Sequence, residues 1–172
     1  MPAEAAPQNN DLKAKIDSLF EAVGSSSRIL RLPPDSPEYA PFKGKRVLMV
    51  DDAKILIENF IPSLTVATDG NAAFILHTAE QSRDVLVDAI LTKDPQIILM
   101  DYHLAGGVEG DDIIRAIIAK GFTGKIVGFS SDSAAQRAFS AAGAVGSVDK
   151  MGSSSDLDEP IKQAAQIAGR AG

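Results

Sequence analysis

The sequence predicts an α/β protein built on one open, doubly wound sheet of five parallel strands, with helices on both faces. From residue 45 onward, short runs of Val, Ile and Leu alternate with segments whose apolar residues recur at helical spacing. The runs are continuously apolar, as is typical of strands buried on both faces of a parallel sheet. The connections are short, so each crossover is expected to be right-handed and to return the chain to the same sheet.

A 44-residue extension precedes the predicted sheet. Residues 1–10 have little to bury and are expected to be disordered. Residues 11–23 predict a helix that Gly24 can end, with apolar residues on one face: Leu12, Ile16, Leu19, Phe20 and Val23. A proline-rich connector follows. We therefore divide the chain into an extension, residues 1–44, and a folded body, residues 45–172. The helix either docks on the body or serves self-association through its apolar face.

The body begins with a strand, and strands and helices then alternate. The predicted strands cover residues 46–50, 73–78, 96–100, 125–129 and 145–148. The first helix of the body contains Ile55 and Phe60 and is expected to close near Pro62, and residues 68–71 are expected to form a turn. The second helix covers residues 82–93. The expected boundaries of the later helices are Asp111 or Asp112 and Gly121, then Asp132 and Gly143, and finally Ser155 or Asp156, with Pro160 in the first turn.

Composition excludes several classes of site and partner. The chain has no cysteine, which excludes disulfides and thiolate chemistry, and its two histidines are too few for a histidine-rich metal centre. A net charge of −6 argues against a nucleic-acid partner, because phosphate binding needs a basic face. No apolar stretch approaches the roughly 20 residues that cross a bilayer, so membrane insertion is not expected. The N-terminus lacks the features of a signal peptide, and a cytoplasmic location is expected.

Carboxylates follow two of the predicted strands at the point where each strand ends. Asp51 and Asp52 come directly after the first strand, and Asp101 follows the third. Parallel strands that lie side by side bring their carboxyl ends to one edge of the sheet, where ligand sites of such sheets are found. Three carboxylates in one place repel each other unless they are protonated or hold a hard cation, for which Mg²⁺ is the usual candidate. Ser130 and Lys150 end the fourth and fifth strands at the same edge.

Taken in order, these strand ends resemble the receiver domain of bacterial two-component response regulators. The resemblance covers residues 45–170 and lies in these segments: Val50-Asp51-Asp52, Met100-Asp101, Phe129-Ser130-Ser131, Gly143-Ala144 and Asp149-Lys150. It implies the flavodoxin-like receiver fold, with five parallel strands in the order 2-1-3-4-5. It also implies a stand-alone receiver, since the body leaves no room for an attached output domain.

The resemblance further implies a role for each residue. Asp101 would accept a phosphoryl group from a phosphohistidine on a sensor histidine kinase or a histidine phosphotransfer protein. Mg²⁺ would be bound by Asp51, Asp52, Asp101 and the backbone carbonyl of His103. Ser130 and Lys150 would bind the phosphoryl group, with Ser131 as a substitute for Ser130. Such a phosphoacceptor is not an enzyme beyond intrinsic autophosphorylation and autodephosphorylation, and its signal leaves through a downstream protein target or a phosphorelay.

The chain departs from the receiver pattern at several places. Ser147 stands where the family has an aromatic residue that turns inward on activation, and Met151 stands where a proline usually follows the lysine. The loop of residues 102–110 is one residue longer than usual and lacks its proline, and its three glycines predict a flexible segment. The His103 side chain either gates water near Asp101 or is a plain loop histidine, and His77 is expected to be a packed or half-exposed strand residue without a function.

These departures keep a second function open, namely an interaction module that has the receiver fold but acts without phosphorylation. The intact acids oppose it, because a module without chemistry has no need to hold three carboxylates together. A hydrolase of the haloacid dehalogenase type is disfavoured, since Asp51-Asp52-Ala53 does not match its Asp-x-Asp pattern. A cofactor binder is disfavoured as well, because neither a P-loop nor a dinucleotide glycine fingerprint is present.

Overall fold

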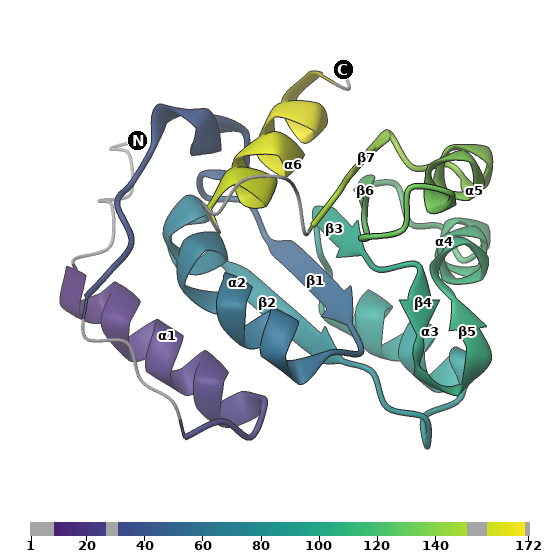
Figure 1. The fold of residues 1–172 in the computed structure, drawn as a ribbon, viewed down its shortest axis with the longest axis horizontal. Coiled ribbons are helices and arrows are strands. Elements are labelled where there is room, and N and C mark those ends of the chain that lie inside the picture. Colours follow the sequence, from purple (N-terminus) through teal and green to yellow (C-terminus); the bar gives the residue numbers. More distant parts are fainter. Residues whose placement is uncertain (1–8, 27–30, 151–157, 171–172) are drawn as a thin grey trace.

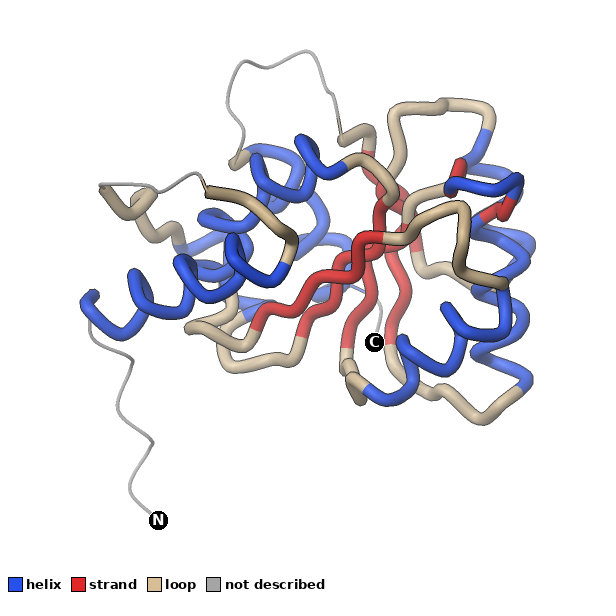
Figure 2. The backbone as a smooth tube through the Cα atoms, turned by 90° about the horizontal axis from the view of Figure 1, so that it is seen from below, coloured by secondary structure: helices blue, strands red, loops and turns tan. Residues whose placement is uncertain are grey.

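Five parallel strands form one sheet at the centre of the protein, in the order β2-β1-β3-β6-β7. The structure is a computed structural model and describes residues 9–26, 31–150 and 158–170. Helices lie on both faces of the sheet (Figures 1 and 2). The strands are β1 (Val47–Asp51), β2 (Ala72–Leu76), β3 (Ile97–Met100), β6 (Lys125–Phe129) and β7 (Gly146–Val148), and a separate small sheet holds β4 (His103–Leu104) and β5 (Val108–Glu109). The helices are α1 (Asn9–Ala22), η1 (Pro37–Phe42), α2 (Lys54–Ala67), α3 (Arg83–Thr92), η2 (Ala105–Gly107), α4 (Gly110–Ala119), α5 (Ala135–Ala142) and α6 (Glu159–Arg170).

The sheet confirms the predicted fold class and strand order, with β6 and β7 as the fourth and fifth parallel strands. The register pairs Val50 of β1 with Met100 of β3, so Asp51 and Asp101 extend from the same edge. All five residues of β1 are buried, in agreement with a strand covered on both faces. The continuous apolar runs therefore identified the centre of the sheet correctly.

Each face of the sheet has its own apolar core. On one face, η1, α2 and α6 pack on the strands, through residues such as Phe42, Phe60 and Ile161. On the other face, α3, α4 and α5 pack on the strands through residues such as Leu86, Ile114 and Phe139. Full burial of one such side chain contributes about 1.5–3 kcal/mol, so the two layers hold the strand ends in a fixed arrangement.

Helix α1 docks on α2 rather than standing apart (Figure 1). Its buried residues Ile16 and Phe20 pack against Ile57 and Ile61 of α2. The segment after the helix is also attached, because the Lys54 Nζ donates to the Gly24 carbonyl oxygen at 2.8 Å. The apolar face that would serve self-association is therefore covered by α2 of the same chain.

The expectation that Pro62 closes its helix is wrong. Helix α2 continues through Pro62 to Ala67. Proline has no N–H to offer the Glu58 carbonyl, which costs one helical hydrogen bond. Every residue from 63 to 67 is buried, and this packing holds the helical course beyond the proline. The predicted turn follows the helix, where the Asn71 amide donates to the Thr68 carbonyl oxygen at 3.3 Å.

The expected cap of α4 is wrong by two residues or more. Glu109 occupies the N-cap and makes no side-chain cap bond, while Asp111 and Asp112 lie in the first turn and both pair with Arg115 at 3.1 Å. The predicted end of α5 is confirmed, because Gly143 adopts a left-handed φ of 117°. Met151, Ser155 and Asp156 lie outside the described residues.

The segment after Asp101 contains a short hairpin that the sequence does not predict. Residues 102–110 were expected to form a flexible loop, but β4 and β5 pair as a short antiparallel hairpin within them. Its amide–carbonyl ladder joins two residues on each side, which is too short for a periodic pattern in the sequence.

In the ranges that the structure describes, none of the helices combines the length and apolar character needed to cross a membrane.

Candidate functional site

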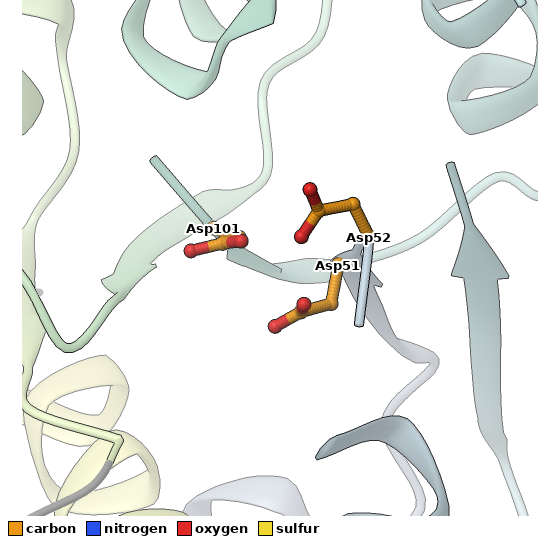
Figure 3. Close-up of side chains that lie close together, drawn as sticks. All are labelled: Asp51, Asp52 and Asp101. Atoms are coloured by element: carbon orange, nitrogen blue, oxygen red, sulfur yellow. The ribbon is translucent and has the colours of Figure 1, made fainter. Parts of the chain in front are cut away.

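Three carboxylates meet beyond the carboxyl ends of β1 and β3 (Figure 3). One oxygen from each of Asp51, Asp52 and Asp101 lies within 4.8 Å of the other two. Asp51 and Asp101 are 1% and 4% exposed, and Asp52 is partly buried. The acids predicted from the strand ends are therefore brought together, because the register of β1 and β3 aligns the two ends.

Lys150 reaches the same place from the end of β7. Its Nζ lies 2.6 Å from the Asp51 Oδ2 and 3.0 Å from the Asp101 Oδ1. The residue is only 6% exposed, so these ion pairs are shielded from solvent. Removal of one partner from a buried pair leaves an uncompensated charge, which makes the lysine and the acids depend on one another.

One lysine does not neutralise three carboxylates. Burial, and then the negative charge of Asp51, raise the pKa of Asp101 from its ordinary value of 3.8 to about 6. Lys150 and the Tyr102 amide, which donates to the Asp101 Oδ1 at 2.9 Å, act in the opposite direction. The cluster thus favours a further positive charge, and its donors are carboxylate oxygens, the ligands that Mg²⁺ prefers. The residues fit a magnesium site.

Ser130 lies next to Lys150 at the ends of β6 and β7. The Ser130 amide donates to the Val148 carbonyl at 3.1 Å, and the Lys150 amide donates to the Ser130 carbonyl at 3.4 Å. Ser130 is 7% exposed, and its Oγ accepts a bond from the Asp132 amide at 3.2 Å. The two predicted phosphoryl-binding residues therefore share one backbone network, while the Ser130 hydroxyl caps the turn that leads to α5.

His103 begins β4, two residues after Asp101, and its side chain is 64% exposed. The ring Nε2 lies 2.7 Å from the Asp132 Oδ2, which joins the loop after β3 to the loop after β6. This hydrogen bond holds the pKa of Asp132 below its usual range. The sequence predicts Asp132 only as a helix start. Its place two residues after Ser130, just beyond the end of the fourth predicted strand, was the available signal.

Known proteins resemble this chain in structure but not detectably in sequence. No protein-family model matches the chain, and no curated protein matches it. A signal receiver domain of a putative Luxo repressor protein from Vibrio parahaemolyticus matches with a TM-score of 0.56 and 18% identity, over 74% of this chain and 92% of that one. A two-component response regulator of the LuxR family from Aurantimonas sp. matches with a TM-score of 0.53 and 25% identity, over 74% and 87% of the two chains.

A third similar structure is the receiver domain of the histidine kinase CKI1 from Arabidopsis thaliana, complexed with Mg²⁺ and BeF₃⁻. It covers 75% of this chain and 95% of its own, with a TM-score of 0.53 and 19% identity. The chain has the receiver fold. Identities this low carry the fold alone.

Ser147 lies in β7 of this receiver fold and is partly buried. It pairs with Gly128 of β6, and a Cβ at Gly128 would overlap the ring of Phe139. The Phe139 ring in turn meets the ring of Tyr102 edge-on, with centroids 5.6 Å apart. The β7 position that usually holds an aromatic residue thus holds a small one here. The aromatic ring of Phe139 from α5 lies instead between β6 and Tyr102, the residue after Asp101.

Proposed function

We propose that the chain is a phosphoryl-accepting receiver in which Asp101 takes a phosphoryl group from a phosphohistidine with the help of Mg²⁺. The observation that supports it best is the placement of the Asp101 carboxylate between the Lys150 Nζ at 3.0 Å and two further carboxylates. A buried cluster of like charges is unfavourable in itself. Binding of a cation and acceptance of a phosphoryl group would explain why the chain has such a cluster.

The transfer step follows from the residues. An Asp101 carboxylate oxygen attacks phosphorus, the new O–P bond forms as the P–N bond of the donor breaks, and the imidazole leaves with the bonding electron pair and takes up a proton from solvent. A bound Mg²⁺ would offset charge on the transferred oxygens. The Lys150 ammonium, now shared between Asp51 and Asp101, would pair with the transferred group, and the Ser130 hydroxyl would donate to that group from the neighbouring strand end.

The partners follow from this chemistry. The donor is a sensor histidine kinase or a histidine phosphotransfer protein, and the modified chain acts on a downstream protein target or passes the group onward. The chain would not be an enzyme in its own right, beyond its intrinsic autophosphorylation and autodephosphorylation. Asp101 would exchange its single carboxylate charge for a phosphoryl group that carries roughly −1.5 to −2 charges, and this more negative group would rearrange the loops that carry His103 and Ser130.

The test is the intact mass of the protein after incubation with Mg²⁺ and acetyl phosphate. We expect one added phosphoryl group, none without Mg²⁺, and none in Asp101→Ala. A matched control is Asp84→Ala, whose carboxylate is 84% exposed on α3 and should leave the gain unchanged. Equal phosphorylation of Asp101→Ala and the wild-type protein would exclude Asp101 as the acceptor.

The second candidate is an interaction module that works without phosphorylation. Ser147 favours it, because the small residue removes the usual side-chain switch from β7. Absence of a phosphoryl gain with acetyl phosphate and with a panel of histidine kinases, in protein that still binds Mg²⁺, would support this function over the first.

A further inference from the structure

His77 is a buried side chain that the proposed chemistry does not use. It follows β2 and is 1% exposed. Its Nε2 lies 3.0 Å from the carbonyl oxygen of Ala105, so Nε2 carries a proton and donates. Its Nδ1 is buried without a hydrogen-bond partner in the part of the chain that the structure describes. An apolar side chain could fill this space without burying an unsatisfied ring nitrogen, so packing alone does not account for the imidazole.

The backbone of His77 is attached to the strand that carries the acids. Its amide donates to the Asp51 carbonyl oxygen at 2.9 Å. Side chain and backbone of this one residue thus connect the end of β1 to the turn after β4. The turn after β4 also lies close to the segment that follows β2, since a Cβ at Gly106, where φ is +76°, would lie 3.4 Å from the backbone of Ala79.

The β4–β5 hairpin depends on such anchors. Each of its strands has two residues, and even longer isolated hairpins are only marginally stable in water. Leu104, which is 4% exposed, anchors it in the core. The Gly110 amide closes its base by donating to the Tyr102 carbonyl at 2.7 Å. The hydrogen bond from the His77 ring to the Ala105 carbonyl holds the turn. Of these anchors, it is the one whose residue also binds Asp51, through the His77 amide.

We propose that His77 is a positioning residue of the metal site: it holds the β4–β5 hairpin, and with it the His103 carbonyl, in place relative to Asp51. The role of the His103 carbonyl as a ligand rests on the proposed function. The anchoring of the hairpin does not rest on the proposed function, because it follows from the two hydrogen bonds of His77. Residues that orient metal ligands without touching the metal commonly change metal affinity by 10–100-fold when replaced.

The test compares His77→Gln with His77→Met in the full chain. The two replacements have nearly the same length and volume, but only glutamine offers an N–H near the position of Nε2. Mg²⁺ affinity is measured by calorimetry, and hydrogen exchange of the β4 and β5 amides is measured in chelator and compared with the β3 amides. We expect the methionine variant to bind Mg²⁺ about tenfold more weakly and its hairpin to exchange about tenfold faster, with the glutamine variant within about threefold of wild type.

Equal Mg²⁺ affinity in both variants, with unchanged hairpin exchange, would overturn the inference while leaving the proposed function intact. A wild-type protein that binds Mg²⁺ but accepts no phosphoryl group would overturn the proposed function alone. A wild-type protein that binds no Mg²⁺ would overturn both. Should the methionine variant fail to fold, His77→Asn replaces it, because its shorter amide does not reach the Ala105 carbonyl.

Discussion

Replacement of Asp101 by asparagine is expected to stabilise the metal-free protein. The wild-type carboxylate is buried beside Asp51, and its pKa is raised to about 6 by burial and by that neighbouring charge. Asparagine keeps an oxygen that accepts bonds from Lys150 and from the Tyr102 amide, but it carries no charge. The substitution therefore removes the repulsion with little change in shape.

The magnitude follows from the pKa. A rise from 3.8 to about 6 corresponds to about 3 kcal/mol of differential interaction between the two protonation states. Because the folded pKa lies above the unfolded one, this contribution to stability is fully present below pH 4 and is lost as the pH rises through about 6. At pH 8 the asparagine variant is thus expected to exceed wild type by up to about 3 kcal/mol, and by about half of that at pH 5.

The assay is thermal unfolding in chelator at both pH values. For a domain of this size, about 3 kcal/mol raises Tm by roughly 6–12 °C. Asp84→Asn serves as the control, since its carboxylate is 84% exposed and its replacement should change stability by less than about 0.5 kcal/mol. Saturating Mg²⁺ should then stabilise wild type more than the variant, because a ligand stabilises only the state that binds it.

An asparagine variant that is no more stable than wild type at pH 8 would refute the reasoning. So would a difference that does not shrink between pH 8 and pH 5, because the stabilisation would then have a cause other than the charge of Asp101.

Three further predictions concern other parts of the structure. Lys150→Met should lower the unfolding free energy in chelator by about 3–5 kcal/mol, because it leaves two buried carboxylates without their positively charged partner. A loss below about 1 kcal/mol in denaturant titrations would contradict this. Gly110→Ala should weaken Mg²⁺ binding in calorimetry and cost about 1–3 kcal/mol, because the new Cβ overlaps the Asp101 carbonyl; unchanged affinity would argue against it. Ile16→Ala should lower the unfolding free energy by about 2–5 kcal/mol, while the control Lys15→Ala should change it little. Coincident melting curves of the two variants would show that α1 is not docked in solution.

The sheet and the acid cluster were predictable because each rests on a local signal. A strand buried on both faces is continuously apolar, and a polar residue directly after it must lie at the edge of the sheet. Asp51 and Asp101 follow two such runs, and Lys125–Phe129 coincides with the predicted fourth strand. The position of these residues in the site then depends only on strand order.

The errors arose where distant contacts override local preference. Pro62 normally ends a helix, but burial of the residues that follow it extends α2 to Ala67. The hairpin after Asp101 is held by Leu104 in the core and by His77, neither of which is visible as a pattern within residues 102–110. Glycines in that segment predicted flexibility, although they also permit the tight turn and the close approach of Gly110 to Asp101.

The cost of the acid cluster bears on the choice between the two proposed functions. A pKa of about 6 for Asp101 corresponds to a cost of about 3 kcal/mol for its charge in the metal-free protein at pH 8, and we expect one asparagine to remove that cost. An interaction module that needs only its surface gains nothing from such a charge. A phosphoryl acceptor needs it, because a neutral amide neither attacks phosphorus nor binds Mg²⁺ as a carboxylate does. The buried charge of Asp101 therefore favours the proposed phosphoryl acceptor over the phosphorylation-independent module, even though Ser147 removes the usual aromatic from β7.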